Sequence, residues 1–322
     1  MMNNKEKYKD FCKKEKNITI FSQYWWLDAV CGKDGWDVVL AEKGGNIYAS
    51  MPYMLYKKHG LTFSTMPMLT QTLGPYIKYP EGQKYVKKLS YEKEIMNILI
   101  EKLPPVDYFY QQFNYSIINW LPFYWREYQQ TTRYTYILSN VDDINTIFEN
   151  FQSNIKTDIK KARKLLTIYE NENLETIYKL VNKTFERQNL VMPYNLEFLE
   201  QIDLKVKKHA NVLSLSAKDS DENIHAVAYI VYDLNEAYYL IGGADPKFRN
   251  SGAQSLLIYS AIELLFHNSK VFNFEGSMIE SIEKFFRGFG TVPKPYFAIS
   301  KSSRKMRIIN ASKEIVKAII RR

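Results

Sequence analysis

The sequence predicts a mixed α/β protein with two domains, each a mixed sheet flanked by helices. Three observations support this prediction. The chain has 322 residues, which is enough for two cores. Apolar residues make up 46% and charged residues 25%, as in ordinary soluble globular proteins. Strand and helix patterns alternate in both halves, and we place the domain boundary near residue 140, where a new helical pattern begins.

The first half combines helices with a hairpin. Ser22 can cap a short helix in "SQYWWLDAVC". In "WDVVLAEKGGNIYAS" two strand patterns flank Gly44-Gly45-Asn46, a typical hairpin turn. The expected elements are helices at 22–31 and 83–102 and strands at 36–42, 47–57, 106–113 and 133–138.

A long amphipathic pattern opens the second half. Between Ile144 and Ala162, apolar residues recur at steps of three and four, which defines one helical stripe. Shorter patterns follow, separated by turn residues such as "KDSDEN". Helices are expected at 174–189, 195–209, 251–268, 279–287 and 303–321, and strands at 211–218, 224–233, 236–243, 270–274 and 295–300.

The stretch "GGADPKFRNSGAQ" (242–254) predicts an anion site. It joins a strand to a helix that is apolar nearly all round, so we expect that helix to be buried and the loop to be rigid. Asn250 or Ser251 can cap the helix, whose first N–H groups have partial positive charge. Gly252 leaves room for an anion and Arg249 adds a full charge. The alternative is that Gly252 is a small turn residue and Arg249 is solvated.

Two segments resemble one family. "RNSGAQ" resembles the acyl-CoA pyrophosphate loop of the GNAT superfamily, with Arg249 and Gly252 at matching positions and Gln254 where Gly or Ala is usual. "NFEGS" and "SIEKFFRGFG" resemble the closing segment of its FemABX-like branch, which includes peptidoglycan-bridge aminoacyl transferases and related acetyltransferases. The resemblance implies GNAT-like domains at 1–140 and 141–302, and transfer of an acyl or aminoacyl group to an amine.

That chemistry suggests roles for residues near the loop. Direct attack by an amine needs a held donor, a partner for the oxyanion and a route for the amine proton. Glu275 is the candidate base, and Tyr239 is a candidate acid or orienting group. The alternatives are a structural hydrogen bond or ion pair for Glu275 and simple packing for Tyr239. The N–H groups around Gly242 and Gly243 are candidate oxyanion donors. Donor binding is expected at Gly242, Gly243, Arg249, Asn250, Ser251, Gly252 and Ala253.

Two helical segments offer cations. Phe286 stands where the family has a lysine, so the candidate cations there are Lys284 and Arg287, which share a helical face. The helix that opens the second half also presents basic residues on one face. They can hold a phosphate or a tRNA stem, and the alternative is a solvated face. These residues are Lys156, Lys160 and Arg163.

The last segment, "SRKMRIINASKEIVKAIIRR", is basic and amphipathic. As a helix over 303–322 it can dock on the first domain, which the resemblance favours, or lie on an anionic membrane. The net charge of +9 also favours anionic partners. A non-catalytic GNAT-fold module that binds nucleic acid or an anionic membrane surface is therefore the alternative function.

The expected donor is acyl-CoA, such as acetyl-CoA, or aminoacyl-tRNA, and the expected acceptor is an amine on a cell-envelope precursor. Cys12 and Cys31 form no CxxC pair and the His residues are scattered, so no metal site is expected. Unpaired thiols fit a reducing compartment. The N-terminal segment has no apolar core typical of a signal peptide. We therefore expect a cytoplasmic protein, with peripheral contact at the inner membrane face as a second possibility.

Overall fold

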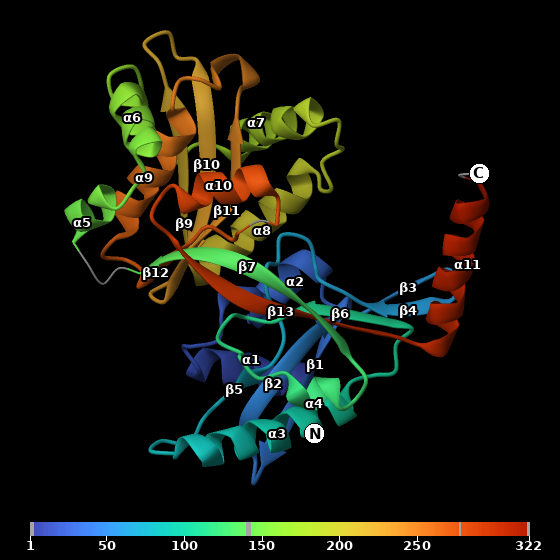
Figure 1. Cartoon of the computed structure of the whole chain (residues 1–322). Helices are drawn as coiled ribbons and strands as arrows, with labels where there is room; N and C mark the ends of the chain where they lie inside the picture. Colours follow the sequence, from blue (N-terminus) through green and yellow to red (C-terminus); the bar gives the residue numbers. More distant parts are fainter. Residues whose placement is uncertain (1–2, 140–142, 277, 321–322) are drawn as a thin grey trace. The chain divides into compact units, whose positions relative to one another are not determined.

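The computed structural model describes residues 3–139, 143–276 and 278–320, with the backbone alone for 313–320. It divides the chain into two compact units (Figure 1). Unit 1 comprises Met1–Arg133 and Pro295–Arg322, and unit 2 comprises Tyr134–Lys294. The boundary expected near residue 140 and Ser277 of the "NFEGS" segment lie outside the described residues.

Unit 2 contains a sheet whose strand order is β7-β12-β11-β10-β9-β8. All neighbours are antiparallel except β11 and β12, which are parallel. Short polar turns, such as the one between β9 and β10, allow the antiparallel pairs to form locally. The strands are β7 (Gln129–Ser139), β8 (Thr167–Glu170), β9 (Asn211–Lys218), β10 (Ile224–Tyr232), β11 (Glu236–Ala244) and β12 (Val271–Asn273).

Helices cover both faces of this sheet (Figure 1). α6 and α9 pack together on one face, and α7 and α8 pack against β11, β10 and β9 on the other. Nine of the 13 residues of α9 are buried, which confirms the prediction of a buried helix here. The helical elements of unit 2 are α5 (Ile144–Glu149), α6 (Ser153–Ala162), α7 (Leu174–Arg187), α8 (Leu196–His209), η2 (Pro246–Phe248), α9 (Ala253–Leu265) and α10 (Glu280–Arg287).

The apolar stripe between Ile144 and Ala162 belongs to two helices, so the prediction of a single stripe on one helix was wrong. α5 ends at Glu149, and the N–H of Gln152 donates to the carbonyl of Gly288 at 2.8 Å. That long-range hydrogen bond replaces an intrahelical one and bends the chain. The apolar residues of both helices still enter the same core, because each helix keeps the 3.6-residue period.

Unit 1 contains a three-stranded sheet, β1-β2-β5, and a second group in the order β3-β4-β6-β13. The predicted hairpin is β1 with β2, and the expected strand 47–57 is divided between β2 and β3. The helical elements are α1 (Asn4–Lys14), η1 (Ile20–Ser22), α2 (Tyr24–Cys31), α3 (Tyr85–Lys102), α4 (Leu121–Tyr124) and α11 (Arg304–Ile320). The strands are β1 (Trp36–Lys43), β2 (Asn46–Met54), β3 (Tyr56–Lys58), β4 (Leu61–Ser64), β5 (Tyr76–Ile77), β6 (Tyr108–Gln112) and β13 (Val292–Ser302).

Helix α1 was absent from the predicted elements, although the sequence contains a signal for it. The Asn3 side chain accepts from the N–H of Glu6 and the Glu6 side chain accepts from the N–H of Asn3, which is a capping box. Tyr8, Phe11 and Cys12 then form the buried stripe of the helix. A polar residue followed three positions later by Glu was therefore sufficient to find it.

The start of α11 is attached to unit 1. The N–H and the hydroxyl of Ser303 donate to Asp107 at 2.8 and 3.0 Å. Farther along the helix, 59% of the Ile308 surface is exposed. Residues 321–322 of the expected terminal helix lie outside the described residues. In the described part of the chain, no helix has the length and apolar character needed to cross a membrane.

Candidate functional site

The sheet of unit 2 opens where β11 and β12 part. Their parallel pairing covers only Glu236–Tyr238 and Val271–Asn273, although β11 continues to Ala244. A bulge at Leu240 interrupts the pairing of β11 with β10 at the same level. Because β12 pairs with β11 only as far as Tyr238, the edge of β11 that faces away from β10 continues without a neighbouring strand. Among the described strands, the N–H and C=O groups on that edge have no partner beyond Tyr238. We call residues 239–244 of β11, together with residues 274–276 in the turn after β12, the strand fork.

Tyr239 lies at the strand fork. Its hydroxyl accepts a hydrogen bond from the side-chain amide of Gln254, at the start of α9. A Cβ at Gly242 would coincide with that hydroxyl, so glycine is required there. Burial raises the pKa of Tyr239, which keeps the phenol protonated. The structure thus brings together Tyr239, Gly242 and Gln254, the residue that differs from the family loop.

Gly243 has a packing role on the opposite face of the sheet. A Cβ there would lie 2.8 Å from the backbone of Val181 in α7. Gly242 therefore leaves room for the Tyr239 side chain on one face of the sheet, and Gly243 leaves room for α7 on the other. The proposed use of the N–H groups around Gly242 and Gly243 as oxyanion donors stays a prediction.

The expected donor loop lies between η2 and α9. Arg249 and Asn250 are exposed, while Ala253 is buried as the first residue of α9. The N-cap is Gly252 in the left-handed conformation, with φ of 76°, and not Asn250 or Ser251 as expected. The Ser251 hydroxyl still accepts from the N–H of Ala253 at 3.3 Å. One donor at the helix start is thus partly occupied by the protein itself.

Gly252 is also required by helix α6. A Cβ at this position would lie 2.5 Å from the carbonyl oxygen of Asp158. Beside it, the ammonium of Lys161 donates to the carbonyl of Asn250 at 2.7 Å. The loop is therefore held against α6, which gives Gly252 a packing reason in addition to the anion approach that the sequence suggested.

A stacked pair supports the segment that leads into Arg249. The rings of His225 and Phe248 are 3.9 Å apart and nearly parallel. His225 Nε2 lies 3.1 Å from a carboxylate oxygen of Asp219, and Lys183 pairs with Asp245 at 2.6 Å. From the sequence, His225 was one of several scattered histidines; the structure shows that it packs beneath η2.

We expect Asp219→Asn to destabilise the protein in a pH-dependent way. Hydrogen bonds from the Asn223 side chain and from His225 lower the pKa of Asp219 from 3.8 to about 2. A lowered carboxyl pKa stabilises the fold above the unfolded value, and this contribution disappears as the pH falls to the folded value. In thermal unfolding, the variant should melt below the wild type at pH 6 and converge with it near pH 2. An equal difference at both pH values would contradict this, and Asp221→Asn on the same turn is the control.

Glu275 lies in the strained turn after β12, which is part of the strand fork. Glu275 and Gly276 have φ of 59° and 61°, and the N–H of Glu275 donates to the Asn273 side chain at 2.8 Å. A left-handed non-glycine residue costs about 1–3 kcal/mol, and such strain is concentrated at functional sites. Burial, together with the charge of Glu236, raises the pKa of Glu275 well above its usual range. These properties suit an acid–base group, and the catalytic role of Glu275 stays a prediction.

The two cations expected near the family lysine position have different surroundings. Phe286 is buried, with its ring 5.3 Å from Phe274 and 6.3 Å from Tyr239, so this position belongs to the core. Arg287 pairs with Glu283 at 2.9 Å, and Lys284 is exposed. Of the two, Lys284 has the more accessible charge.

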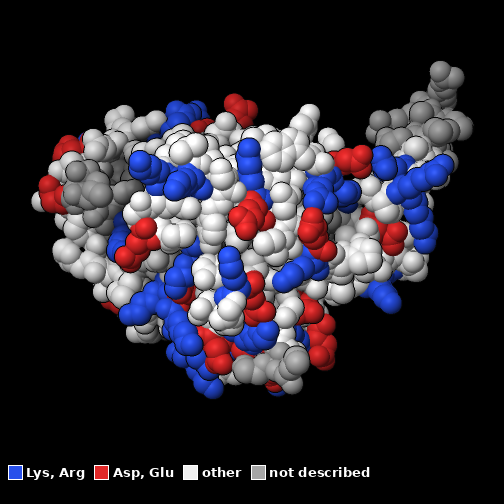
Figure 2. All heavy atoms as spheres, turned by 90° about the horizontal axis from the view of Figure 1, so that it is seen from below, with Lys and Arg blue, Asp and Glu red and all other residues white. Residues whose placement is uncertain are grey.

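The basic face of α6 is partly neutralised. Lys156 pairs with Glu149 at 3.0 Å and Arg163 with Glu263 at 3.0 Å, while Lys160 is exposed. Figure 2 shows the same mixture on a wider scale, with Asp and Glu among the Lys and Arg side chains of the visible face. Whether α6 binds a phosphate or a tRNA stem stays a prediction.

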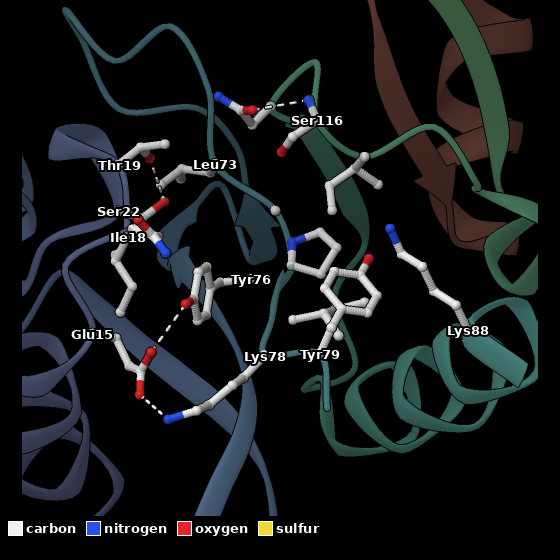
Figure 3. Close-up of a pocket in the computed structure, with 16 residues that line it drawn as sticks. Glu15, Ile18, Thr19, Ser22, Leu73, Tyr76, Lys78, Tyr79, Lys88 and Ser116 are labelled. Carbon is white, nitrogen blue, oxygen red and sulfur yellow. Dashed lines mark hydrogen bonds and ion pairs between the residues drawn. The ribbon is translucent and has the colours of Figure 1, made fainter. Parts of the chain in front are cut away.

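Unit 1 contains a pocket of about 590 Å³ that sequence reasoning missed (Figure 3). Its apolar lining includes Leu73 and Ile117. Tyr76 donates to Glu15 at 3.2 Å, and the ammonium of Lys88 lies 4.2 Å from the centre of the Tyr79 ring. The lining residues come from four separate stretches of the chain, so no local pattern could indicate them.

Two other chemistries find little support. Burial raises the pKa of both the Cys12 and Cys31 thiols to about 12, so neither is a ready nucleophile. Within residues 3–139, 143–276 and 278–320, no group of three or more His, Cys, Asp or Glu residues is arranged to hold a metal ion.

Comparison with known proteins agrees with this geometry. Residues 149–274 match the family model of the acetyltransferase (GNAT) domain. No curated protein sequence matches the chain. Residues 149–274, all within unit 2 as described above, therefore form a GNAT-type acetyltransferase domain.

Solved structures extend the likeness to the whole fold. FemX has a TM-score of 0.65 at 11% identity, over 92% of this chain and 96% of that one. The C-terminal domain of a putative lysylphosphatidylglycerol synthetase from Agrobacterium fabrum has a TM-score of 0.55 at 11% identity, over 97% and 96%. A tandem GNAT protein from the clavulanic acid biosynthesis pathway has a TM-score of 0.52 at 6% identity, over 93% and 94%. The chain therefore has the fold of tandem GNAT proteins, and the two-domain α/β prediction is confirmed.

Proposed function

We propose that this GNAT-type acyltransferase moves an acyl or aminoacyl group from acyl-CoA or aminoacyl-tRNA to an amine on a cell-envelope precursor. The observation that supports this most is the strand fork, where an unpaired strand edge, a protonated tyrosine and a raised-pKa carboxyl lie around one break in the sheet. Acyl transfer to an amine needs a held donor and groups that transfer protons, and these three features can supply both.

The donor lies along β11 in this proposal. Those N–H and C=O groups of residues 239–244 that have no partner among the described strands can bind the amides of a donor arm in the way that a sheet edge binds an added strand. The phosphates of the carrier then lie near Arg249 and the start of α9, where the charge of Arg249 and the helix dipole both favour an anion.

The reaction uses groups of the strand fork. The acceptor nitrogen attacks the donor carbonyl, a C–N bond forms, and the N–H groups around Gly242 and Gly243 stabilise the oxyanion. The Glu275 carboxylate accepts the proton of the amine. The C–S bond of a thioester, or the C–O bond of an aminoacyl ester, then breaks. Tyr239 can donate its proton to the leaving sulfur or oxygen, since burial keeps the phenol protonated.

The acceptor class is inferred from proteins of similar fold and from the pocket of unit 1. FemX and a lysylphosphatidylglycerol synthetase share this fold, which is consistent with an envelope precursor as acceptor. The pocket of unit 1 supports this, because tyrosine rings, a polar rim and the ammonium of Lys88 suit an anionic, hydroxyl-rich molecule. We propose that this pocket of unit 1 binds an anionic, hydroxyl-rich ligand of that class.

A non-catalytic module that binds anions is the competing proposal. The buried aromatic side chain of Phe286 in place of a lysine favours it. The ion pairs on α6 disfavour a non-catalytic module, because they reduce the basic surface that a nucleic acid or an anionic membrane could contact.

Arg249→Ala is expected to weaken donor binding by about 10- to 100-fold, since a charge-assisted hydrogen bond contributes roughly 1.5–3 kcal/mol. Calorimetric titration with acetyl-CoA and with aminoacyl-tRNA measures this and identifies the carrier. Lys247→Ala, an exposed cation two residues away, is the matched control and should bind normally. The proposed function is wrong if neither carrier binds, or if Arg249→Ala binds the carrier as tightly as the wild type. Binding without transfer to any amine would support the module instead.

A further inference from the structure

One of the buried carboxylates of unit 2 lies at the start of β11, and the proposed reaction assigns no role to it. Glu236, the first residue of β11, is only 8% exposed. Its carboxylate accepts from the Tyr238 hydroxyl at 2.6 Å and from the Asn273 amide at 2.7 Å. Charge-assisted hydrogen bonds of this length are strong, and they hold the carboxylate in one orientation.

Asn273 connects this carboxylate to Glu275. The side chain of Asn273 is fully buried, and its amide nitrogen donates to Glu236. Its amide oxygen accepts from the Thr135 hydroxyl at 2.6 Å and from the N–H of Glu275 at 2.8 Å. A rotated amide would direct its nitrogen at the backbone N–H of Glu275 and its oxygen at the Glu236 carboxylate, so these two partners together determine which way Asn273 faces.

The same contacts hold the strained turn. Glu275 keeps its left-handed conformation while its N–H is bonded to Asn273, and a Cβ at Gly276 would clash with the backbone of Tyr134 and Thr135. Strain of this kind persists only where surrounding contacts determine it. Two hydrogen bonds, both made by the Asn273 side chain, thus connect Glu236 to the backbone that orients the Glu275 side chain.

We propose that Glu236 is a positioning residue for Glu275: through Asn273 it holds the turn that orients the Glu275 side chain, and its buried charge acts on the Glu275 carboxyl. The catalytic part of this inference rests on the proposed function, whereas the contact and the charge effect do not. Glu236 itself need not touch a substrate.

The other ionisable groups around this turn leave Glu236 as the dominant charge. Tyr238 of β11 is hydrogen-bonded to Glu236. Tyr136 of β7 donates to Glu283 of α10 at 3.2 Å, and Glu283 pairs with Arg287, so those two charges offset each other. Burial and the charge of Glu236 are the two effects that raise the pKa of Glu275.

The test is a direct titration of the Glu275 carboxyl. Carbon-13 NMR of protein labelled at the glutamate carboxyl carbons follows it, and the resonance lost in Glu275→Gln assigns the signal. In Glu236→Gln, removal of the neighbouring charge should move the midpoint down by about one pH unit. Tyr229→Phe removes a different buried hydrogen bond of unit 2, to Asp203 at 2.9 Å, and should leave the midpoint unchanged. An unchanged midpoint in Glu236→Gln overturns the proposal.

A second variant tests the proposal in the opposite direction. Tyr238→Phe removes the hydroxyl that donates to the Glu236 carboxylate at 2.6 Å and leaves both the charge and the contact with Asn273 in place. With one donor fewer, the charge of Glu236 is less compensated, so the midpoint should rise. A midpoint that falls or stays constant in this folded variant overturns the proposal, also where Glu236→Gln fails to fold.

Activity separates this proposal from the proposed function. If the wild type transfers acyl groups, the rising limb of its pH–rate profile should move with the NMR midpoint in both variants. A shifted midpoint in a protein without transfer activity refutes the proposed function and supports the charge effect. A normal rate with an unshifted midpoint refutes the role of Glu236 alone.

Discussion

Glu275→Gln is expected to lower kcat by about 10²- to 10⁴-fold, the usual loss when a general base is removed, with donor KM within about twofold. Glutamine keeps the shape of the side chain and cannot accept the proton of the attacking amine. Steady-state transfer to an amine acceptor, with the donor identified by titration, measures the effect. A variant with more than about half of wild-type kcat would exclude Glu275 as the base.

The free energy of unfolding provides the control for Glu275→Gln. The substitution should lower kcat but raise the stability of the folded protein at pH 8. The folded-state pKa of Glu275 is raised, so the stabilisation linked to its proton is complete below the unfolded value of 4.5 and is lost as the pH rises through the folded value. The glutamine variant has no such loss. It should therefore be as stable as the wild type at low pH and more stable at pH 8. A variant that melts earlier at pH 8 would mean that the loss of activity reflects misfolding.

Gly252→Ala is expected to lower the free energy of unfolding by roughly 2–4 kcal/mol and to weaken donor binding. The φ of 76° is unfavourable for alanine, and the new Cβ would lie 2.5 Å from the carbonyl oxygen of Asp158. Relief requires α6 to move away from α9, which also moves the loop containing Arg249. Urea denaturation and carrier titration measure the two effects.

Gly45→Ala separates backbone strain from the clash. Gly45 has φ of 79°, and a Cβ there would meet no atom within 4 Å. That variant should lose only about 1 kcal/mol, the cost of the left-handed conformation, and should bind the donor normally. Equal losses in Gly45→Ala and Gly252→Ala would show that the contact with Asp158 does not limit the loop.

The segments that sequence reasoning located best are those with strong local patterns. β9, β10, β11 and α9 lie within one to three residues of their predicted bounds, because alternation or an apolar run defines them without help from distant residues. The two-residue strand β5 gives too short a pattern to recognise. The break between α5 and α6 depends on a hydrogen bond to Gly288, which is far along the chain and has no local signal.

In the candidate site, too, the residues with a local sequence motif were predicted, and the contacts between distant segments were not. Glu275, Tyr239 and the loop at Arg249 were chosen from motifs, and the structure places all three in unit 2. The packing of Gly252 against Asp158, the stacking of His225 on Phe248 and the pocket of unit 1 could not be predicted, since each joins segments distant in sequence.

The sequence by itself determined the α/β class, most of the elements and the GNAT-like loop, because periodicity, caps and glycines act between neighbouring residues. The tertiary structure alone decided where β11 and β12 part, which basic residues of α6 are neutralised and that two hydrogen bonds of Asn273 connect Glu236 to Glu275. Those facts depend on long-range pairing and burial, which set charge and proton affinity through distances that chain order does not contain.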